Sequence, residues 1–205
     1  MIQEIGKHRV TDHCITSGTI DKMMAGVTAR VFYSDPPWGD GNLKYWATLN
    51  ERMSGRSFAA LTYTELLDRI RDLIRKYVNG HVFLETGQRF VDRAVSDMNP
   101  VIGGIKTFRI KYRSGSRFVE NYLIYGLTHG SPPLSFDYSP EGMTGFSVVE
   151  SCILAASAPG EIVFDPCCGM GYSARAAVNA GMRFYGNEFN PKRLEKTIEF
   201  LRSRS

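Results

Sequence analysis

The sequence predicts an α/β fold with a doubly wound sheet and helices on both faces. Three observations support this fold class. Short β-branched and aromatic runs alternate with helical patterns along most of the chain, as they do in sheets covered by helices. The 205 residues are 43% hydrophobic, which is enough for a core of domain size. Charged residues are 22% of the chain, an ordinary share that argues against a disordered chain.

The first elements end at a proline-rich turn. We expect a short strand over His8–Asp12, a helical turn over Ile20–Met24 and a strand over Ala29–Ser34, which reads ARVFYS. The prolines that follow forbid further regular pairing. Gly39–Ser57 is polar and contains glycine, so a long loop is expected there, of the kind that is functional or mobile.

The clearest helical pattern covers Thr64–Tyr77, where leucine and isoleucine recur at helical spacing and Thr64 is the expected N-cap. A buried strand over His81–Glu85 and a helix over Gln88–Met98 follow. Strands over Thr107–Tyr112 and Phe118–Gly126 flank a short polar segment and form an expected hairpin.

The C-terminal part continues the alternation of strands and helices. Its expected helices are Ser147–Ser157, Tyr172–Ala180 and Lys192–Arg202, and its expected strands are Glu161–Phe164 and Arg183–Gly186. Ligands of such sheets bind at the carboxyl ends of the strands. Two segments with unusual chemistry, Asp35–Trp38 and Asp165–Gly171, follow strands directly.

Composition narrows the function classes. No apolar run is long enough to cross a membrane, and the N-terminus lacks the apolar stretch of a signal peptide, so we expect a cytoplasmic protein with no membrane partner. The net charge of +4 permits an anionic partner without requiring one. The four cysteines form no CxxC pair and the histidines are scattered, so no metal is expected and the thiols are expected to be reduced.

The segment DPCCGMG lies between an expected strand and an expected helix. Its glycines allow a tight turn and a close approach of the backbone to a ligand, and the helix N-terminus offers free N–H groups to an anion. Glu188 follows the next strand, where its carboxylate could accept both hydroxyls of a ribose. The pattern indicates a nucleoside cofactor; the alternative is an ordinary turn with a solvated Glu188.

The segment Asp35-Pro36-Pro37-Trp38 forms a rigid turn at a strand end. The Asp35 carboxylate and the Pro36 carbonyl are both hydrogen-bond acceptors, and Trp38 offers a flat apolar face. Together they could hold an exocyclic amino group by both protons and stack on its ring. The alternative is a structural turn with a packed tryptophan.

These segments resemble the motifs of the amino-methyltransferases, which methylate adenine N6 or cytosine N4 with S-adenosylmethionine. DPPW resembles their catalytic motif, FDPCCGMG their cofactor motif, and GNEFNPKRLEKTIEFL the motif that follows. RFVENYLIYG and SAPGEIVFDP are similar to the strands around these motifs. The catalytic motif precedes the cofactor motif, which resembles the permuted β class of the DNA enzymes.

The resemblance implies a Rossmann-like methyltransferase sheet with a C-terminal β-hairpin reversal. It implies one permuted domain over residues 1–205, with a catalytic half at about 1–128 and a cofactor-motif half at about 146–205. The segment Thr128–Phe146 is too short for a large target-recognition domain. Ser17-Gly18 stands where a Gly-Asp pair is common in the family.

The resemblance also implies site residues. The catalytic residues would be Asp35, Pro36, Pro37 and Trp38. The cofactor-binding residues would be Asp165, Pro166, Cys168, Gly169, Gly171, Glu188, Asn190, Ser17 and Phe146.

Candidate nucleic-acid contacts lie in the expected loop and hairpin. Lys44 and Trp46 follow the catalytic motif, and Arg109, Lys111 and Arg113 alternate along a strand, so that their side chains share a face suited to phosphates. The alternatives are a lid with a buried Trp46 and a solvated sheet edge protected by charge.

The favoured function is methyl transfer to an exocyclic amine of a DNA base, with adenine N6 preferred and the base flipped onto Trp38. A cytosine-N4 enzyme, an RNA adenine methyltransferase of the MT-A70 type and a non-catalytic partner subunit are the alternatives. The expected partner is DNA, with RNA, a homodimer or a partner subunit left open.

Overall fold

The computed structural model describes residues 1–57, 61–114, 116–128, 130 and 139–204. The strands are β1 (Ile2–Ile5), β2 (His8–Thr11), β3 (Ala29–Ser34), β4 (Val78–Gly87), β5 (Ile102–Ser114), β6 (Arg117–Thr128), β7 (Ile162–Asp165) and β8 (Arg183–Asn187). The helices are α1 (Thr19–Met23), α2 (Gly39–Ser54), α3 (Tyr63–Tyr77), α4 (Val91–Met98), α5 (Phe146–Ala156), α6 (Tyr172–Asn179) and α7 (Pro191–Arg202), with a 3-10 turn at Gln88–Phe90.

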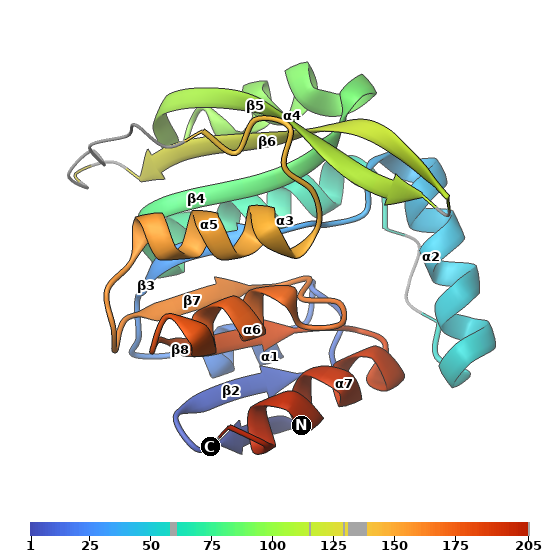
Figure 1. The fold of residues 1–205 in the computed structure, drawn as a ribbon. Coiled ribbons are helices and arrows are strands. Elements are labelled where there is room, and N and C mark those ends of the chain that lie inside the picture. Colours follow the sequence, from blue (N-terminus) through green and yellow to red (C-terminus); the bar gives the residue numbers. More distant parts are fainter. Residues whose placement is uncertain (58–60, 115, 129, 131–138, 205) are drawn as a thin grey trace.

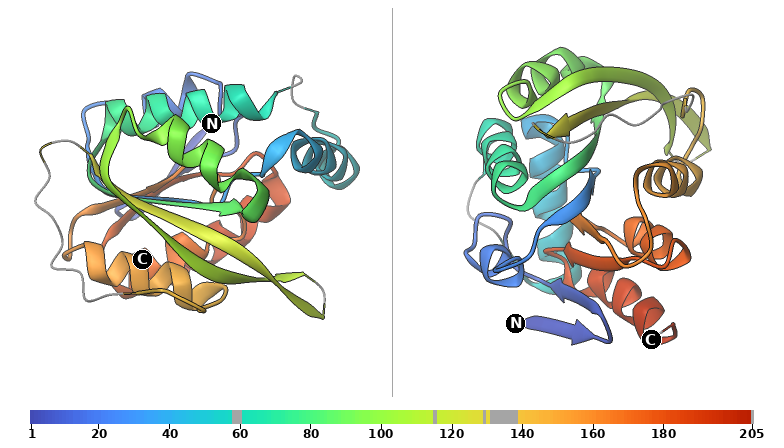
Figure 2. Two further views of the ribbon diagram at one scale, coloured as in Figure 1. Left: turned by 90° about the horizontal axis from the view of Figure 1, so that it is seen from above. Right: turned by 90° about the vertical axis from the view of Figure 1, so that its left-hand side faces the viewer.

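In the described part of the chain, the strands form one sheet in the order β1-β2-β8-β7-β3-β4-β6-β5. The five strands from β2 to β4 are parallel to their neighbours, whereas β1, β6 and β5 pair in antiparallel fashion. Helices cover both faces (Figures 1 and 2). One apolar layer lies under α1, α3 and α4 and the other under α5, α6 and α7. The expected α/β class is confirmed.

The position of the hairpin differs from the expectation of a C-terminal reversal. The antiparallel hairpin β5–β6 comes from the middle of the chain and forms the sheet edge beyond β4. The C-terminal strands β7 and β8 are parallel, because α6 connects them as a crossover. The described C-terminal segment therefore ends in α7 and not in a hairpin.

The N-cap of helix α3 is Thr62, two residues before the expected cap. The Thr62 hydroxyl accepts a hydrogen bond from the Glu65 amide at 3.2 Å, and the Glu65 carboxylate accepts one from the Thr62 amide at 2.8 Å. This reciprocal pair is a capping box. Thr64, the expected cap, instead accepts a hydrogen bond from Arg93 at its hydroxyl.

The expected loop at Gly39–Ser57 is wrong, because residues 39–54 form helix α2. The segment is mostly polar, so its apolar residues gave only a weak helical pattern. The positions that are buried or half-buried in the structure do recur at helical spacing, and they are Leu43, Trp46, Asn50 and Met53. The helix ends at Gly55, whose φ of 68° is in the left-handed region that closes helices. Since β3 leads directly into it, α2 stands beyond the carboxyl ends of the parallel strands (Figure 1).

Smaller differences lie at element ends. Strand β1 was not expected, and it pairs with β2 in antiparallel fashion. Strand β4 and both hairpin strands are longer than expected, and the expected helix Gln88–Met98 consists of a 3-10 turn and α4. Most of the segment between Thr128 and Phe146 lies outside the described residues.

Candidate active site

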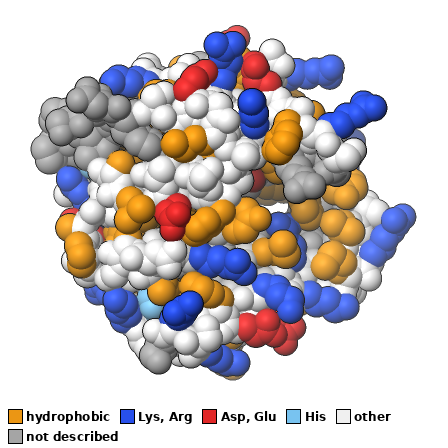
Figure 3. All heavy atoms as spheres, viewed as in Figure 1, with side chains coloured by type: hydrophobic (Ala, Val, Ile, Leu, Met, Phe, Trp, Pro, Cys, Tyr) orange, Lys and Arg blue, Asp and Glu red, His pale blue; other side chains and the backbone are white. Residues whose placement is uncertain are grey.

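A cavity of about 480 Å³ opens at the carboxyl ends of β3, β7 and β8 and is bounded by α2. Its wall includes Asp35, Pro36, Pro37, Trp38, Trp46, Asn50, Tyr112, Pro166, Cys167, Glu188 and Arg193. Figure 3 shows hydrophobic side chains gathered on this side of the molecule, with Lys and Arg side chains around them. The fold therefore brings the two predicted motifs together in one cavity, although they are far apart in the sequence.

Asp35 is the first residue beyond β3. The neighbouring strand end is held in place because the buried Ser34 hydroxyl donates to Asp165 Oδ1 at 3.1 Å. Asp35 Oδ1 accepts a hydrogen bond from Trp38 Nε1 at 3.2 Å. Although the side chain is open to the cavity, the protein encloses it closely enough that desolvation raises the pKa of Asp35 to about 6, against the opposing effects of Trp38 and Arg193. Asp35 is therefore an anionic acceptor at neutral pH.

Aromatic rings form much of the cavity wall. Trp38 meets Tyr112 edge to face, with ring centroids 5.6 Å apart and an interplanar angle of 78°. Gly87 leaves the space for this indole, because a Cβ there would lie 3.0 Å from Trp38 Cε3. The cavity thus combines an anionic acceptor with flat faces on which a planar ring can stack.

The glycine loop is organised by Asp165. Its buried carboxylate accepts hydrogen bonds from Ser34 Oγ, from the Cys167 amide at 2.9 Å and from Ser173 Oγ at 2.6 Å. Desolvation raises its pKa to about 7, against these hydrogen bonds. Asp165 therefore shapes the loop from behind and does not line the cavity.

Gly171 shows why the loop needs glycine. Its φ of 85° lies in the left-handed region, and a Cβ on it would lie 2.5 Å from Thr197 Oγ1 of α7. Gly169 also has a positive φ, of 56°. The loop can therefore turn tightly while it passes close to α7.

Glu188 follows β8, is buried and lines the cavity. Its Oε1 accepts a hydrogen bond from the Asn190 amide at 2.8 Å. Burial raises its pKa, whereas the positive charge of Arg193 and hydrogen bonds from backbone amides lower it. The expected position of this carboxylate, at the tip of the second strand and inside the cavity, is the one observed.

Asn190 has a different place from the one expected for a cofactor ligand, because its side chain does not line the cavity. Asn190 Oδ1 accepts from the amides of Lys192 and Arg193 at 3.0 and 3.3 Å and so caps α7. Its Nδ2 donates to Asn50 Oδ1 of α2 at 2.8 Å. Asn190 therefore joins the N-terminus of α7 to the helix that bounds the cavity.

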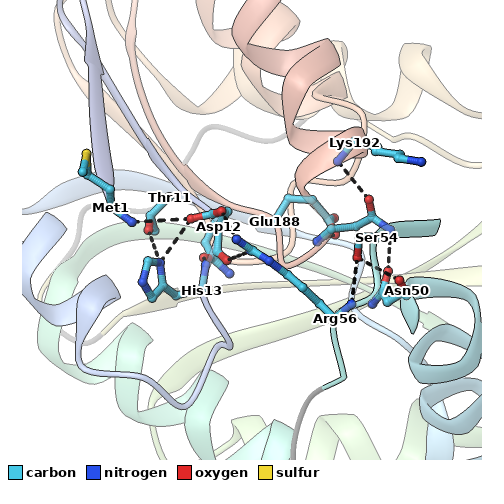
Figure 4. A network of polar contacts seen from close by, with 11 residues as sticks. Met1, Thr11, Asp12, His13, Asn50, Ser54, Arg56, Glu188 and Lys192 are labelled. Atoms are coloured by element: carbon cyan, nitrogen blue, oxygen red, sulfur yellow. Dashed lines mark hydrogen bonds and ion pairs between the residues drawn. The ribbon is translucent and has the colours of Figure 1, made fainter. Parts of the chain in front are cut away.

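A second link holds the C-terminal end of α2 (Figure 4). Ser54 Oγ donates to the Asn50 carbonyl at 2.8 Å. Arg56 forms an ion pair with Asp12 at the end of β2, with 2.8 Å between Nη2 and Oδ2. The Arg56 pair ties the C-terminal end of α2 to the sheet, and the Asn190 bond ties α2 to α7.

Replacing Asn190 with alanine is expected to lower the free energy of unfolding by about 1 to 2 kcal/mol, because α7 loses its cap and the Asn50 amide loses a buried partner. Asn190→Ser keeps a capping oxygen without a buried charge and removes the donor to Asn50, so its loss should be smaller. Thermal unfolding of the three proteins measures this. Equal melting temperatures for Asn190→Ala and the unchanged protein would contradict the assignment.

Other expected cofactor residues lie outside the cavity wall. Ser17 has a buried hydroxyl with no hydrogen-bond partner in the described part of the chain. Phe146 begins α5 and packs edge to face on Tyr172, with centroids 5.9 Å apart. Cys168 is buried in the core below the loop, and it is Pro166 and Cys167 that line the cavity.

Of the residues expected to contact nucleic acid, one lines the cavity and the others described do not. Trp46 lines the cavity, whereas Lys44 is exposed on α2 and does not. Arg109 and Lys111 share one exposed face of β5, and Tyr112, on the alternate face, is the hairpin residue that lines the cavity. The Arg109 side chain also pairs with Glu141, with 3.1 Å between Nε and Oε1. Arg109 and Lys111 therefore do not face into the cavity. Arg113 belongs to β5, but its side chain lies outside the described part of the structure.

Arg193 is a cavity residue that the motifs did not indicate. Its guanidinium lies over the Trp46 ring, 4.4 Å from the centroid, and its charge acts on both Asp35 and Glu188. The stack joins α7 to α2 across the cavity wall. The one feature of the sequence that could have indicated Arg193 as a site residue is its position in the first turn of the helix that follows Glu188.

Glu85, near the end of β4, was also missed as a site residue. Tyr33 donates its hydroxyl hydrogen to Glu85 Oε1 at 2.5 Å, and Asn121 Nδ2 lies 3.5 Å from Oε2. Burial, reinforced by the nearby Asp35 charge, raises the pKa of Glu85 to about 8. The folded protein therefore holds a neutral carboxylic acid beside the anionic Asp35 at neutral pH.

Replacing Glu85 with glutamine should make the protein relatively more stable as the pH rises. The folded pKa of about 8 lies above an unfolded value of about 4.3, so the folded state binds an extra proton and its stability falls as pH rises through this window. The glutamine side chain keeps an acceptor for Tyr33 without a titrating proton. Melting temperatures should therefore be similar at pH 5 and higher for the variant at pH 8. A difference that does not change with pH would contradict this, and Glu51→Gln on the exposed side of α2 is the control.

Comparisons with known proteins agree with this geometry. Residues 144–199 match the family model N6_N4_Mtase, described as DNA methylase. The crystal structure of M1.HpyAVI is similar over 94% of this chain and 97% of its own, with a TM-score of 0.67 and 15% identity. No curated protein sequence matches this chain.

Two further solved structures share the fold. TTHA0409, a candidate DNA modification methylase from Thermus thermophilus determined with S-adenosyl-L-methionine, has a TM-score of 0.60 and 15% identity over 96% of this chain and 94% of its own. The cytosine-N4-specific PvuII DNA methyltransferase has a TM-score of 0.63 and 11% identity over 90% and 83%. The shared fold and the family match support the expected resemblance to the N6/N4 amino-methyltransferases.

Among the described residues, no group of three or more His, Cys, Asp or Glu side chains could hold a metal ion. None of the described helices combines the length and apolar character needed to cross a bilayer.

Proposed function

We propose that this chain transfers a methyl group from S-adenosyl-L-methionine to the exocyclic amino group of a DNA base, as an N6/N4 amino-methyltransferase. The observation that carries the proposal is the meeting of two sites in one cavity. Asp35 and Pro36 line the same cavity as Pro166, Cys167 and Glu188. A cavity with both can place an amine next to a methyl donor.

The cavity residues fit the cofactor. Glu188 offers a buried carboxylate for ribose hydroxyls, and the turn at Gly169 and Gly171 lets the loop before α6 approach a ligand closely. Pro166, Cys167 and Glu188 would hold it. When bound, S-adenosylmethionine supplies a methyl group on a positively charged sulfur, which is already activated for transfer.

Asp35 and Pro36 prepare the amine. The lone pair of an exocyclic amine is delocalised into the base, which makes the nitrogen a poor nucleophile. The Asp35 carboxylate and the Pro36 carbonyl accept hydrogen bonds from its two N–H groups and draw the nitrogen toward tetrahedral geometry, so that the lone pair points out of the plane of the ring. Holding the reacting atoms about 3 Å apart and in line is then a major catalytic contribution.

Trp38 is the proposed stacking face for the base, which must leave the duplex to reach the cavity. Stacking on an aromatic side chain contributes roughly 1–3 kcal/mol per base. We propose adenine N6 as the target, because an initial aspartate in the catalytic motif is more frequent in the adenine enzymes. Cytosine N4 is the alternative that the likeness to the PvuII enzyme supports.

Residues 1–205 are proposed to form one permuted methyltransferase domain that acts on DNA in the cytoplasm. Lys44, Trp46, Arg109, Lys111 and Arg113 are its proposed nucleic-acid contacts. Because Arg109 and Lys111 lie on the face away from the cavity, we assign them to the phosphate backbone and not to the base.

Mass spectrometry of nucleosides tests the proposal. The protein is incubated with S-adenosylmethionine and either DNA or RNA of mixed sequence, and the nucleosides are then analysed. N6-methyladenine in DNA is expected. N4-methylcytosine alone would overturn the choice of base, and product only in RNA would overturn the choice of DNA. No product and no calorimetric binding of S-adenosylmethionine would indicate a non-catalytic partner subunit.

A further inference from the structure

The tip of the β5–β6 hairpin carries apolar side chains in solvent. Phe118 is 60% exposed, Val119 is 43% exposed and Tyr112 is 40% exposed. Tyr112 pairs with Val119, and Arg113 pairs with Phe118, in the last rungs before the turn. Single exposed apolar residues are ordinary, but neighbouring ones on one protruding element mark an interaction surface.

This apolar tip lies at the cavity. Tyr112 lines the cavity and contacts the Trp38 ring, and its cross-strand partner Val119 shares its face of the hairpin. Phe118 is one residue nearer the turn, roughly 3.3 Å farther along the strand. Its cross-strand partner is Arg113, so its side chain projects from the opposite face of the hairpin tip. Figure 1 shows the tip at the same end of the sheet as α2, the helix that also bounds the cavity.

The charge near the tip matches a polyanion. Residues 111–120 contain Lys111, Arg113 and Arg117 and one acidic residue, Glu120, which gives a net charge of +2 (three cations minus one anion). Lys111 and Arg117 are exposed. Cations beside apolar side chains suit a duplex, where the former contact phosphates and the latter enter the base stack.

We propose that the hairpin tip, with Val119 on its cavity face and Phe118 on its opposite face, is a wedge that enters duplex DNA and fills the gap left by the base turned into the cavity. The inference rests on the proposed function and adds to it the device that stabilises the opened duplex. Removing a base from the stack costs a few kcal/mol. An apolar side chain in the gap offsets part of this cost by restoring contact with the neighbouring bases.

The first test compares two substrates that differ in the need for a wedge. Methyl transfer is measured on native genomic DNA of mixed sequence and on the same DNA kept denatured. Phe118→Ala with Val119→Ala is expected to slow transfer to native DNA about tenfold or more, the effect of losing about 1.4 kcal/mol, and to change transfer to denatured DNA less than about twofold. Phe118→Trp should retain the rate on native DNA.

Leu154→Ala provides the control, because Leu154 is 54% exposed on α5 and is not part of the cavity wall. It should change neither rate. Equal losses on both forms of DNA, or no loss in the double variant, would overturn the wedge. A change in sedimentation of the double variant without DNA would instead assign the tip to contact with a protein.

A second readout does not depend on catalysis. A duplex with an abasic site next to 2-aminopurine has a ready-made gap, and a side chain that enters it changes the fluorescence of that base. The unchanged protein should produce the change, and the double variant should not. Absence of methyl transfer by the unchanged protein on every DNA would refute the proposed function, whereas absence of this Phe118-dependent signal would refute the wedge.

Discussion

Replacing Asp35 with alanine should abolish methyl transfer while leaving affinity for S-adenosylmethionine nearly unchanged. Asp35 lies at the end of β3, where it accepts from Trp38, and we assign its carboxylate to the target amine. Loss of one well-placed group that stabilises a transition state lowers turnover about 10²- to 10³-fold. Single-turnover transfer of labelled methyl groups measures the rate, and calorimetry measures cofactor binding. Near-normal turnover in a folded variant would disprove this role.

Asp35→Asn separates the charge from the shape. The amide oxygen can still accept from Trp38, but it is a weaker acceptor for the amine, so most of the activity should be lost. The pH profile gives an independent check. Since the pKa of Asp35 is about 6 and the ionised form is the active one, the rate of the unchanged protein should be half-maximal near pH 6 and level off about one pH unit higher. A rate that stays constant from pH 5 to 8 would contradict this assignment.

Replacing Glu188 with alanine should weaken the binding of S-adenosylmethionine. The buried carboxylate lines the cavity, and hydrogen bonds to charged groups contribute on the order of 1.5–3 kcal/mol. The dissociation constant should therefore rise about 10- to 150-fold, at roughly 1.4 kcal/mol for each tenfold change. Calorimetry measures it directly.

Glu199→Gln is the matched control, since Glu199 lies on α7 with an exposed side chain and pairs only with Lys196 among the contacts described. It should leave the dissociation constant unchanged. If Glu188→Ala and Glu199→Gln bind S-adenosylmethionine equally well, Glu188 is not the ribose ligand. A fall in affinity at Glu188 that is matched by a fall in melting temperature would assign the residue to the support of the loop.

Much of the site could be predicted because its motifs are local. Asp35 and Glu188 each follow a buried apolar strand, and the glycine loop follows another. Short apolar runs of this kind form buried strands whatever their position in the sheet. The residue that follows such a strand lies at its carboxyl end. The sequence by itself therefore determined the α/β class, the strands that carry the motifs and the edge at which the motifs lie.

The tertiary structure decided which other residues join them. Asn50 is polar, so it did not contribute to an apolar pattern that would have predicted α2. In the structure it is buried, and Asn190 of α7 donates a hydrogen bond to its side chain. Glu85 lies near Asp35 because β4 pairs with β3, and Tyr112 reaches the cavity because β6 and β5 follow β4 in the sheet. No local pattern specifies this order. Arg193 depends on the packing of α7 against α2, where its guanidinium lies over Trp46. Such contacts join residues distant in sequence, and their partners exist only once the sheet order and helix packing are set.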